Sequence, residues 1–165
     1  MAKTSPRASN NPYKKKESII GLEQGKIPPQ AVELEEAVLG ALMIDKNALN
    51  EVIDILESEC FYKDSHREIY STIKTLFTES QPIDMLTVST MLRKNGKLEL
   101  CGGDFGIANL TQKVASSAHI EYHARIIVQK HIQRSLIRVS SEIIHDAYEE
   151  STDVLDLLDK AEGKL

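Results

Sequence analysis

Two histidines, His119 and His123, stand four residues apart, a spacing that places two imidazoles on one face of a helix, where they could share a metal ion. Such a pair would suit a small helical metal-binding hydrolase that activates water on the metal. Glu121 falls off the shared face, however, and no third ligand is apparent. We therefore favour a cap-region position for His119 and a polar-face position for His123, and keep the hydrolase as an alternative.

The other candidate catalytic motifs are incomplete. His66 is expected near a helix start, and no activated serine or cysteine partner can be inferred for it, so a packing or capping role is favoured. A phosphate-binding P-loop ends in Gly-Lys-Ser/Thr, but Gly25-Lys26 runs into Ile27 and Gly96-Lys97 into Leu98. We therefore expect this chain not to be an enzyme and to have no catalytic, cofactor-binding or metal-binding residues.

The charge of the chain is unevenly distributed. Residues 1–26 hold six Lys or Arg against two acids, about +4, whereas the remainder holds fourteen against twenty-three, about -9, which together give the net charge of -5. An acidic body argues against a dedicated nucleic-acid binder. The lysines 14–16 could contact nucleic acid, which stays as an alternative, but the Ser-, Asn- and Pro-rich composition favours a disordered basic leader over residues 1–26.

Composition places the chain among ordinary soluble domains. Its 165 residues are 41% hydrophobic and 27% charged, enough to bury one core. No apolar run approaches the roughly 20 residues that cross a bilayer, and no apolar signal segment is present at the N-terminus. We expect a cytoplasmic protein with no membrane association, in which Cys60 and Cys101 stay free thiols.

A helical head is predicted over residues 27–116. Apolar residues at helical spacing define about five helices, separated by Gln81-Pro82, Asn95-Gly96 and Gly102-Gly103. Asp64 or Ser65 is expected to cap the third helix and Asp84 the fourth. The first three helices carry the sets Leu34, Val38, Ala41 and Leu42; Leu49, Val52, Ile53 and Leu56; and Ile69, Tyr70, Ile73, Leu76 and Phe77.

A helical hairpin is predicted over residues 117–165. Its first helix carries two apolar rows about 100° apart, a face wider than a lone helix needs. Ser151, Thr152 or Asp153 is expected to cap the second helix, which the end of the sequence cuts short. The predicted interaction residues are Val128, Ile132, Leu136, Ile137, Val139, Ile143, Ile144, Val154, Leu158, Ala161 and Leu165. Arg134 and Arg138 are left for water or a partner.

These features occur in an order that resembles a known family. Pro28-Pro29, Glu33 and residues 36–40 (Glu-Ala-Val-Leu-Gly) are similar to the opening segment of the N-terminal domain of bacterial replicative DNA helicases of the DnaB type. Each fragment alone is weak, and the colinear order over residues 27–165 carries the resemblance. The later matches are Asp45, Ala48, Val52, Phe61-Tyr62, His66, Ile69-Tyr70, Asp84, Thr87-Val88, Gly96, Leu98, Gly102-Gly103, Tyr122, Arg134, Leu136-Ile137, Leu157-Leu158-Asp159 and Ala161-Glu162.

The resemblance implies an all-α assembly and docking module. Members of the family pair through the hairpin into dimers and then a hexameric ring, and they bind the C-terminal domain of primase; a helicase loader is a further candidate partner. ATP and magnesium would belong to a separate RecA-like ATPase domain that this sequence lacks, and DNA would be contacted only through the full-length ring. Gly106, where the family tends to have an aromatic residue, and His119, where it often has asparagine, depart from the pattern.

Overall fold

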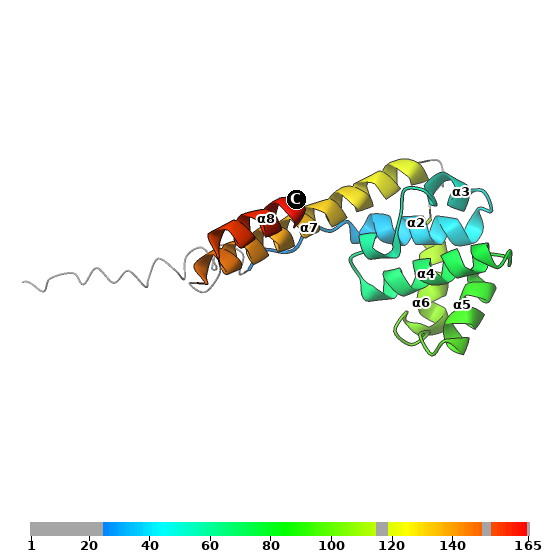
Figure 1. Ribbon diagram of the computed structural model, residues 1–165. Coiled ribbons are helices and arrows are strands. Elements are labelled where there is room, and N and C mark those ends of the chain that lie inside the picture. The colour runs from blue at the N-terminus through cyan, green and yellow to red at the C-terminus, as the bar shows by residue number, and fades with distance from the viewer. Residues whose placement is uncertain (1–24, 115–118, 150–152, 165) are drawn as a thin grey trace, which may run out of the picture.

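The computed structural model describes residues 25–114, 119–149 and 153–164 (Figure 1). These residues form seven α-helices and one short 3-10 helix, with no strand among them, so the predicted all-α class is confirmed. The elements are α2 (Val32–Ile44), α3 (Ala48–Val52), the 3-10 helix η2 (Ser58–Cys60), α4 (Asp64–Thr78), α5 (Met85–Lys94), α6 (Gly103–Gln112), α7 (Ile120–Tyr148) and α8 (Val154–Lys164).

Helix α2 lies at the centre of the head, where α4, α6 and α7 pack on it. Its residues Val38, Leu39 and Leu42 are almost completely buried in a single apolar cluster. Phe61 and Tyr70 join the cluster as a tilted aromatic pair with ring centroids 5.0 Å apart. Each such side chain contributes about 1.5–3 kcal/mol through burial, which makes this cluster the main source of stability.

Three of the predicted helix boundaries are confirmed by side-chain and backbone contacts. Asp84 caps α5 by accepting from the backbone N–H of Leu86 and Thr87, both at 2.9 Å, and Thr87 completes a capping box. The helix stops at Asn95 and Gly96, which has a left-handed φ of 68°. Asp153 begins α8 in the same way, since its carboxylate accepts from Leu155 N–H at 2.8 Å; Ser151 and Thr152 lie outside the described residues.

Two other helix predictions were wrong at their edges. Asp64 and Ser65 do not cap α4, because Lys63 takes the N-cap position with an extended backbone and Asp64 is already the first helical residue. The second predicted helix does not reach Leu56, because α3 ends at Val52. The Leu56 carbonyl instead accepts from Tyr70 Oη at 3.0 Å, which ties this turn to α4. Phe77, a member of the apolar set predicted for this helix, is 43% exposed.

Helix α7 links the head to the hairpin. Ile120, Ala124 and Ile127 are buried in the same cluster as α2, so the first turns of α7 complete the core of the head. The rest of α7 extends away from the head, and α8 folds back along it (Figure 1). A single continuous helix therefore sets the direction in which the hairpin projects.

Glycine at position 106 is required by close packing within the head. A Cβ built on Gly106 would lie 2.3 Å from the carbonyl oxygen of Cys101, which no real side chain could tolerate without movement. Gly102 and Gly103 both adopt positive φ as the chain turns into α6. An aromatic residue at position 106 would not fit this turn.

Candidate protein-interaction surface

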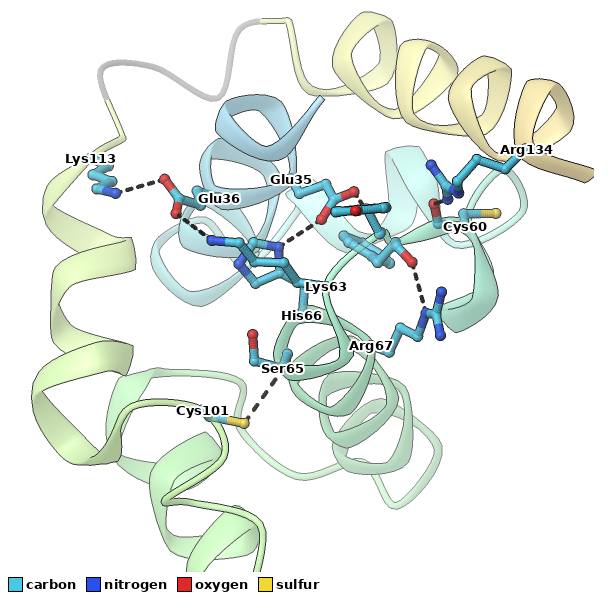
Figure 2. Close-up of polar contacts among 12 residues, drawn as sticks. Glu35, Glu36, Cys60, Lys63, Ser65, His66, Arg67, Cys101, Lys113 and Arg134 are labelled. Carbon is cyan, nitrogen blue, oxygen red and sulfur yellow. Dashed lines mark hydrogen bonds and ion pairs between the residues drawn. The ribbon is translucent and has the colours of Figure 1, made fainter. Parts of the chain in front are cut away.

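Arg134 joins α7 to two other segments of the chain. Its Nη1 donates to the carbonyl oxygen of Pro29 at 2.8 Å, and its Nη2 donates to that of Cys60 at 2.7 Å. The guanidinium also lies over the ring of Tyr62, 5.6 Å from its centroid. Figure 2 shows the side chain reaching from α7 toward Cys60. Arg134 is therefore half-buried and internally bonded, and the prediction that it faces water or a partner was wrong.

A buried ionisable pair lies beneath this junction. Glu35 of α2 and His66 of α4 are both almost fully buried, and Glu35 Oε2 lies 2.7 Å from His66 Nδ1 (Figure 2). The second carboxylate oxygen, Oε1, accepts from the backbone N–H of Tyr62 at 2.7 Å. A buried carboxylate is tolerated only with such partners. The packing role predicted for His66 fits this geometry, since nothing nucleophilic lies in the pair.

His131 sits beside the same junction, one turn of α7 before Arg134. Burial, followed by the positive charges of Arg134 and Arg67, lowers its pKa, against the opposing effect of Glu59. Glu36 lies near the start of α2. Burial raises the pKa of its carboxyl group, but the hydrogen bond and ion pair with Lys113 lower this pKa, so that it lies below its ordinary value.

The hairpin closes along one row of apolar residues. Val139 is buried, and Ile143 of α7 with Leu157 and Ala161 of α8 are half-buried. An ion pair between Asp146 and Lys160 bridges the two helices. Helix α8 therefore covers Val139 and Ile143, whereas Ile132 and Leu136 of the same row and Ile137 and Ile144 of the second row stay exposed.

The predicted interaction residues fall into three groups. Val139 is buried, and Val128, Ile143 and Ala161 are half-buried, with Val128 packed against the core of the head. Leu165 lies outside the described residues. The remaining residues are exposed: Ile132, Leu136, Ile137, Ile144, Val154 and Leu158. Six of the predicted apolar side chains are thus exposed on the projecting hairpin, and so are Leu155 and Tyr148, which the predicted interaction residues do not include.

The described residues offer no metal site. No group of three or more His, Cys, Asp or Glu side chains comes together in residues 25–114, 119–149 and 153–164. His119 is the N-cap residue of α7, and it makes no side-chain cap hydrogen bond. Burial raises the pKa of Cys60 and raises that of Cys101 to about 11, so both thiols stay protonated near neutral pH.

The family model described as the DnaB-like helicase N-terminal domain matches residues 27–129. The chain belongs to this family. The match covers the whole head and the first part of α7, and it ends before the exposed half of the hairpin. The resemblance inferred from colinear motifs is therefore confirmed.

Relatives and solved structures agree with this assignment. The chain is 42% identical over 143 residues to the replicative DNA helicase DnaB of Rhodothermus marinus, covering 87% of this chain and 15% of the relative. It is 36% identical to the DnaB of Geobacillus stearothermophilus, covering 85% and 31%. The chain thus spans less than a third of the length of either relative.

Two solved structures share the fold. The N-terminal domain of DnaB helicase from Mycobacterium tuberculosis superposes with a TM-score of 0.80 at 29% identity, covering 84% of this chain and 97% of that one. A DnaB-like replicative helicase, solved in a study of its interactions with primase, superposes with a TM-score of 0.67 at 22% identity, covering 82% and 32%. At 22% identity, the similarity to this second structure is a similarity of fold alone.

Sequence analysis missed two residues of the junction. Glu35 gives no signal in the sequence, because an acid beside a second acid, Glu36, is typical of a solvated face, yet Glu35 is buried among the apolar residues of α2. Arg134 was assigned to the polar face, since no periodicity indicates that a backbone carbonyl lies within reach. The nearest signal was its place in the motif that includes Leu136 and Ile137.

Proposed function

We propose that this chain is the N-terminal assembly and docking module of a replicative DNA helicase and that it acts through the α7–α8 hairpin. The observation that carries the proposal is the set of exposed apolar side chains on an element that projects from the head. A second copy packing on these residues would remove them from water and form a dimer. In the longer protein such dimers assemble into a hexameric ring.

The same hairpin is proposed to bind the C-terminal domain of primase. The names of the relatives place them in DNA replication, and the study of a fold neighbour with primase supports this partner. A helicase loader is a further candidate for the surface. Binding to different partners at different times requires a surface that is exposed in the isolated chain, and the hairpin meets that requirement.

Helicase activity is proposed to belong to the longer protein and not to this chain. In this view ATP and magnesium bind a separate motor domain, this chain needs no cofactor, and DNA is contacted only through the assembled ring. The proposed location is the cytoplasm. Among the described residues, no helix combines the length and apolar character needed to cross a bilayer.

The two alternatives have less support. A metal-dependent hydrolase built on His119 and His123 is not favoured, because the described residues supply no third ligand. Nucleic-acid binding through the basic leader would depend on residues outside the described ranges. It is not favoured, because the rest of the chain carries a net negative charge.

Sedimentation of the purified chain tests the assembly proposal. We expect Leu136→Asp to shift the dimer toward monomer, because a carboxylate in an apolar interface costs several kcal/mol to desolvate. The matched control is Leu86→Asp on the head, where Leu86 is 71% exposed; this variant should keep the wild-type mass. A wild-type chain that is a strict monomer at high concentration would overturn the proposal.

Capture of the primase C-terminal domain tests the docking proposal. The wild-type chain and Leu86→Asp should retain it, whereas Leu158→Asp on α8 should lose about tenfold or more in affinity, as expected when an apolar contact is replaced by a charge. Equal retention by all three proteins would show that primase does not dock on the hairpin.

A further inference from the structure

An apolar groove lies on the head between the end of α4 and one face of α5. Its apolar side chains are Leu76, which is buried, Met91, which is half-buried, and Leu86, which is 71% exposed. Figure 1 shows α5 on the side of the head that faces away from the hairpin. None of these three side chains belongs to the surface proposed for a second copy or for primase, so the groove is available to another partner.

The local fold does not require leucine at position 86. Asp84 caps α5 through the backbone N–H of Leu86, and this contact does not depend on the Leu86 side chain. A single exposed leucine is common on protein surfaces. Leu86, however, lines the same groove as Leu76 and Met91, and apolar side chains that share a surface open to water are typical of a site that another protein covers.

The charge of Glu79, beside these apolar side chains, is also not explained by the fold of the chain. Glu79 is the C-cap residue of α4, where the last carbonyl groups and the helix dipole already make the surroundings negative. Helix α4 has no basic residue in its last turn, and the exposed Glu79 carboxylate forms no ion pair with any residue that the structure describes. A cation from a partner would be stabilised there by the carboxylate and by the helix end.

The shape of the groove indicates the kind of segment that would fit it. Leu86 and Lys94 lie in the first and last turns of α5, about 12 Å apart along the helix axis, which is roughly two helical turns. The described residues form no strand, so they offer no sheet edge to which an extended peptide could add. An amphipathic helix binds through side chains alone, and apolar residues three or four apart would lie along such a groove.

Lys94 adds a positive charge to the rim of the groove. Its neighbour Arg93 pairs with Asp104, whereas the exposed Lys94 ammonium forms no ion pair with any residue in the described part of the chain. The rim therefore carries one unpaired charge of each sign, Glu79 from α4 and Lys94 from α5. A partner that carries both a base and an acid is complementary to this rim.

We propose that the groove binds an amphipathic helix of a protein other than primase, with apolar side chains on Leu86 and Met91, a lysine or arginine beside Glu79 and an acid beside Lys94. The two rim charges select such a helix, because a like charge placed beside either of them would be repelled. The inference is independent of the hairpin functions. It gives the head a partner of its own and leaves the hairpin free for assembly and primase.

Binding of a synthetic helical peptide to the full chain tests the proposal. The probe has about 14 residues, with leucines at helical spacing, an arginine at one end, a glutamate at the other and alanines elsewhere. In a second peptide, glutamate replaces the arginine. Fluorescence anisotropy of a label on the peptide measures both affinities. We expect the wild-type chain to bind the arginine peptide, and to bind the glutamate peptide about fivefold more weakly.

Variants of the chain locate the site. Leu86→Asp should lower the affinity for the arginine peptide about tenfold or more, because it places a charge in the apolar contact. Leu100→Asp is the matched control: it changes an exposed leucine of the head that does not line the groove, and it should leave the affinity unchanged. Glu79→Lys should reverse the preference, so that this variant binds the glutamate peptide more tightly than the arginine peptide.

The proposal is overturned if neither peptide binds, if Leu86→Asp and Leu100→Asp bind equally well, or if Glu79→Lys keeps the wild-type preference. Loss of binding in Leu158→Asp would place the peptide on the hairpin and would overturn it as well. Leu86→Asp is expected to keep the dimer mass and the capture of primase. Failure of this inference is therefore distinguishable from failure of the functions proposed for the hairpin.

Discussion

At the scale of single residues, Arg134 has the widest structural influence, because one side chain connects three segments. Its two hydrogen bonds go to the carbonyl group of Pro29 in the N-terminal segment and to that of Cys60 in η2. Without Arg134 both carbonyl groups would face α7 without this donor. A planar guanidinium can donate to two acceptors at once, whereas an ammonium cannot reproduce that geometry. Arginine is therefore specifically required at this position.

We expect Arg134→Lys to lower the free energy of unfolding by about 1–3 kcal/mol, the cost of leaving a partly buried carbonyl without its donor. Arg138→Lys is the matched control on the same helix. Arg138 bonds to Glu142 on the exposed surface, so its replacement should change stability by less than about 0.5 kcal/mol. Urea denaturation measures both, and equal effects would contradict the assigned role of Arg134.

His131 should make stability depend on pH. Its pKa in the folded chain lies below the ordinary value of 6.5, so the unfolded chain binds the proton more readily. Lowering the pH through 6.5 therefore favours unfolding, and this contribution to stability is present in full only above that pH. Arg134 and Arg67 repel the added charge, and Glu59 offsets them in part.

The measurement compares urea midpoints at pH 7.5 and 5.5. The urea midpoint of the wild-type chain should be lower at pH 5.5 than at pH 7.5. In His131→Gln this difference in midpoint should be smaller, because glutamine has no proton to gain. His145→Gln, on the exposed side of α7, is the control and should keep the wild-type dependence. A dependence that is unchanged in His131→Gln would exclude this residue as its source.

At the scale of elements, helix ends follow local chemistry closely. Asp84 satisfies two backbone N–H groups at the start of α5, so Asp84→Ala should cost about 1 kcal/mol of stability. Asp54→Ala removes an exposed carboxylate outside any helix cap and should change stability by less than about 0.5 kcal/mol. Thermal melts followed by circular dichroism would reveal the difference, and matching melts would refute the role of the cap.

Two helical glycines should respond in opposite ways to the same substitution. Gly106→Ala places a Cβ 2.3 Å from the Cys101 carbonyl oxygen and should destabilise the head by about 1–3 kcal/mol. Gly163→Ala adds a Cβ where no atom lies within 4 Å, and it should stabilise α8 by up to about 1 kcal/mol. Chemical denaturation of the two variants tests the pair, and a neutral Gly106→Ala would contradict the tight packing of α6.

At the scale of the whole molecule, the distribution of burial along α7 predicts uneven stability. The turn around Ile120–Ile127 belongs to the core, whereas the turns around Ile137–Tyr148 contact mainly α8. Hydrogen exchange should therefore be slowest near Ile120–Ile127 and faster beyond Ile137, because local opening of the hairpin does not require the head to unfold. Uniform protection along α7 would mean that head and hairpin unfold together.

Much of the fold could be predicted because local signals and tertiary packing agree in the head. The capping of α5 by Asp84 and its end at Asn95-Gly96 depend on residues within one helix, so spacing in the sequence was sufficient. Leu56 was misassigned for the opposite reason. Its carbonyl accepts a hydrogen bond from Tyr70, fourteen residues away in the chain, and no local pattern indicates such a contact.

The candidate surface could be predicted only in part. Periodicity identified two apolar rows on the long helix, but it could not say which of them α8 covers, because that depends on the rotation of one helix against the other. The structure buries Val139 and exposes Ile137, although both lie in predicted rows. The same limit concealed the Arg134 junction, whose acceptors are backbone atoms 105 and 74 residues away in the chain.

The sequence by itself determined that the chain is helical, where several of its helices begin and end, and which family it resembles, since these follow from local propensity and the order of short motifs. Only the tertiary structure decided that Glu35 pairs with His66, that Arg134 fastens the hairpin, and which side chains remain exposed for a partner. The reason is physical: burial is a property of two surfaces in contact, and a linear pattern describes only one of them.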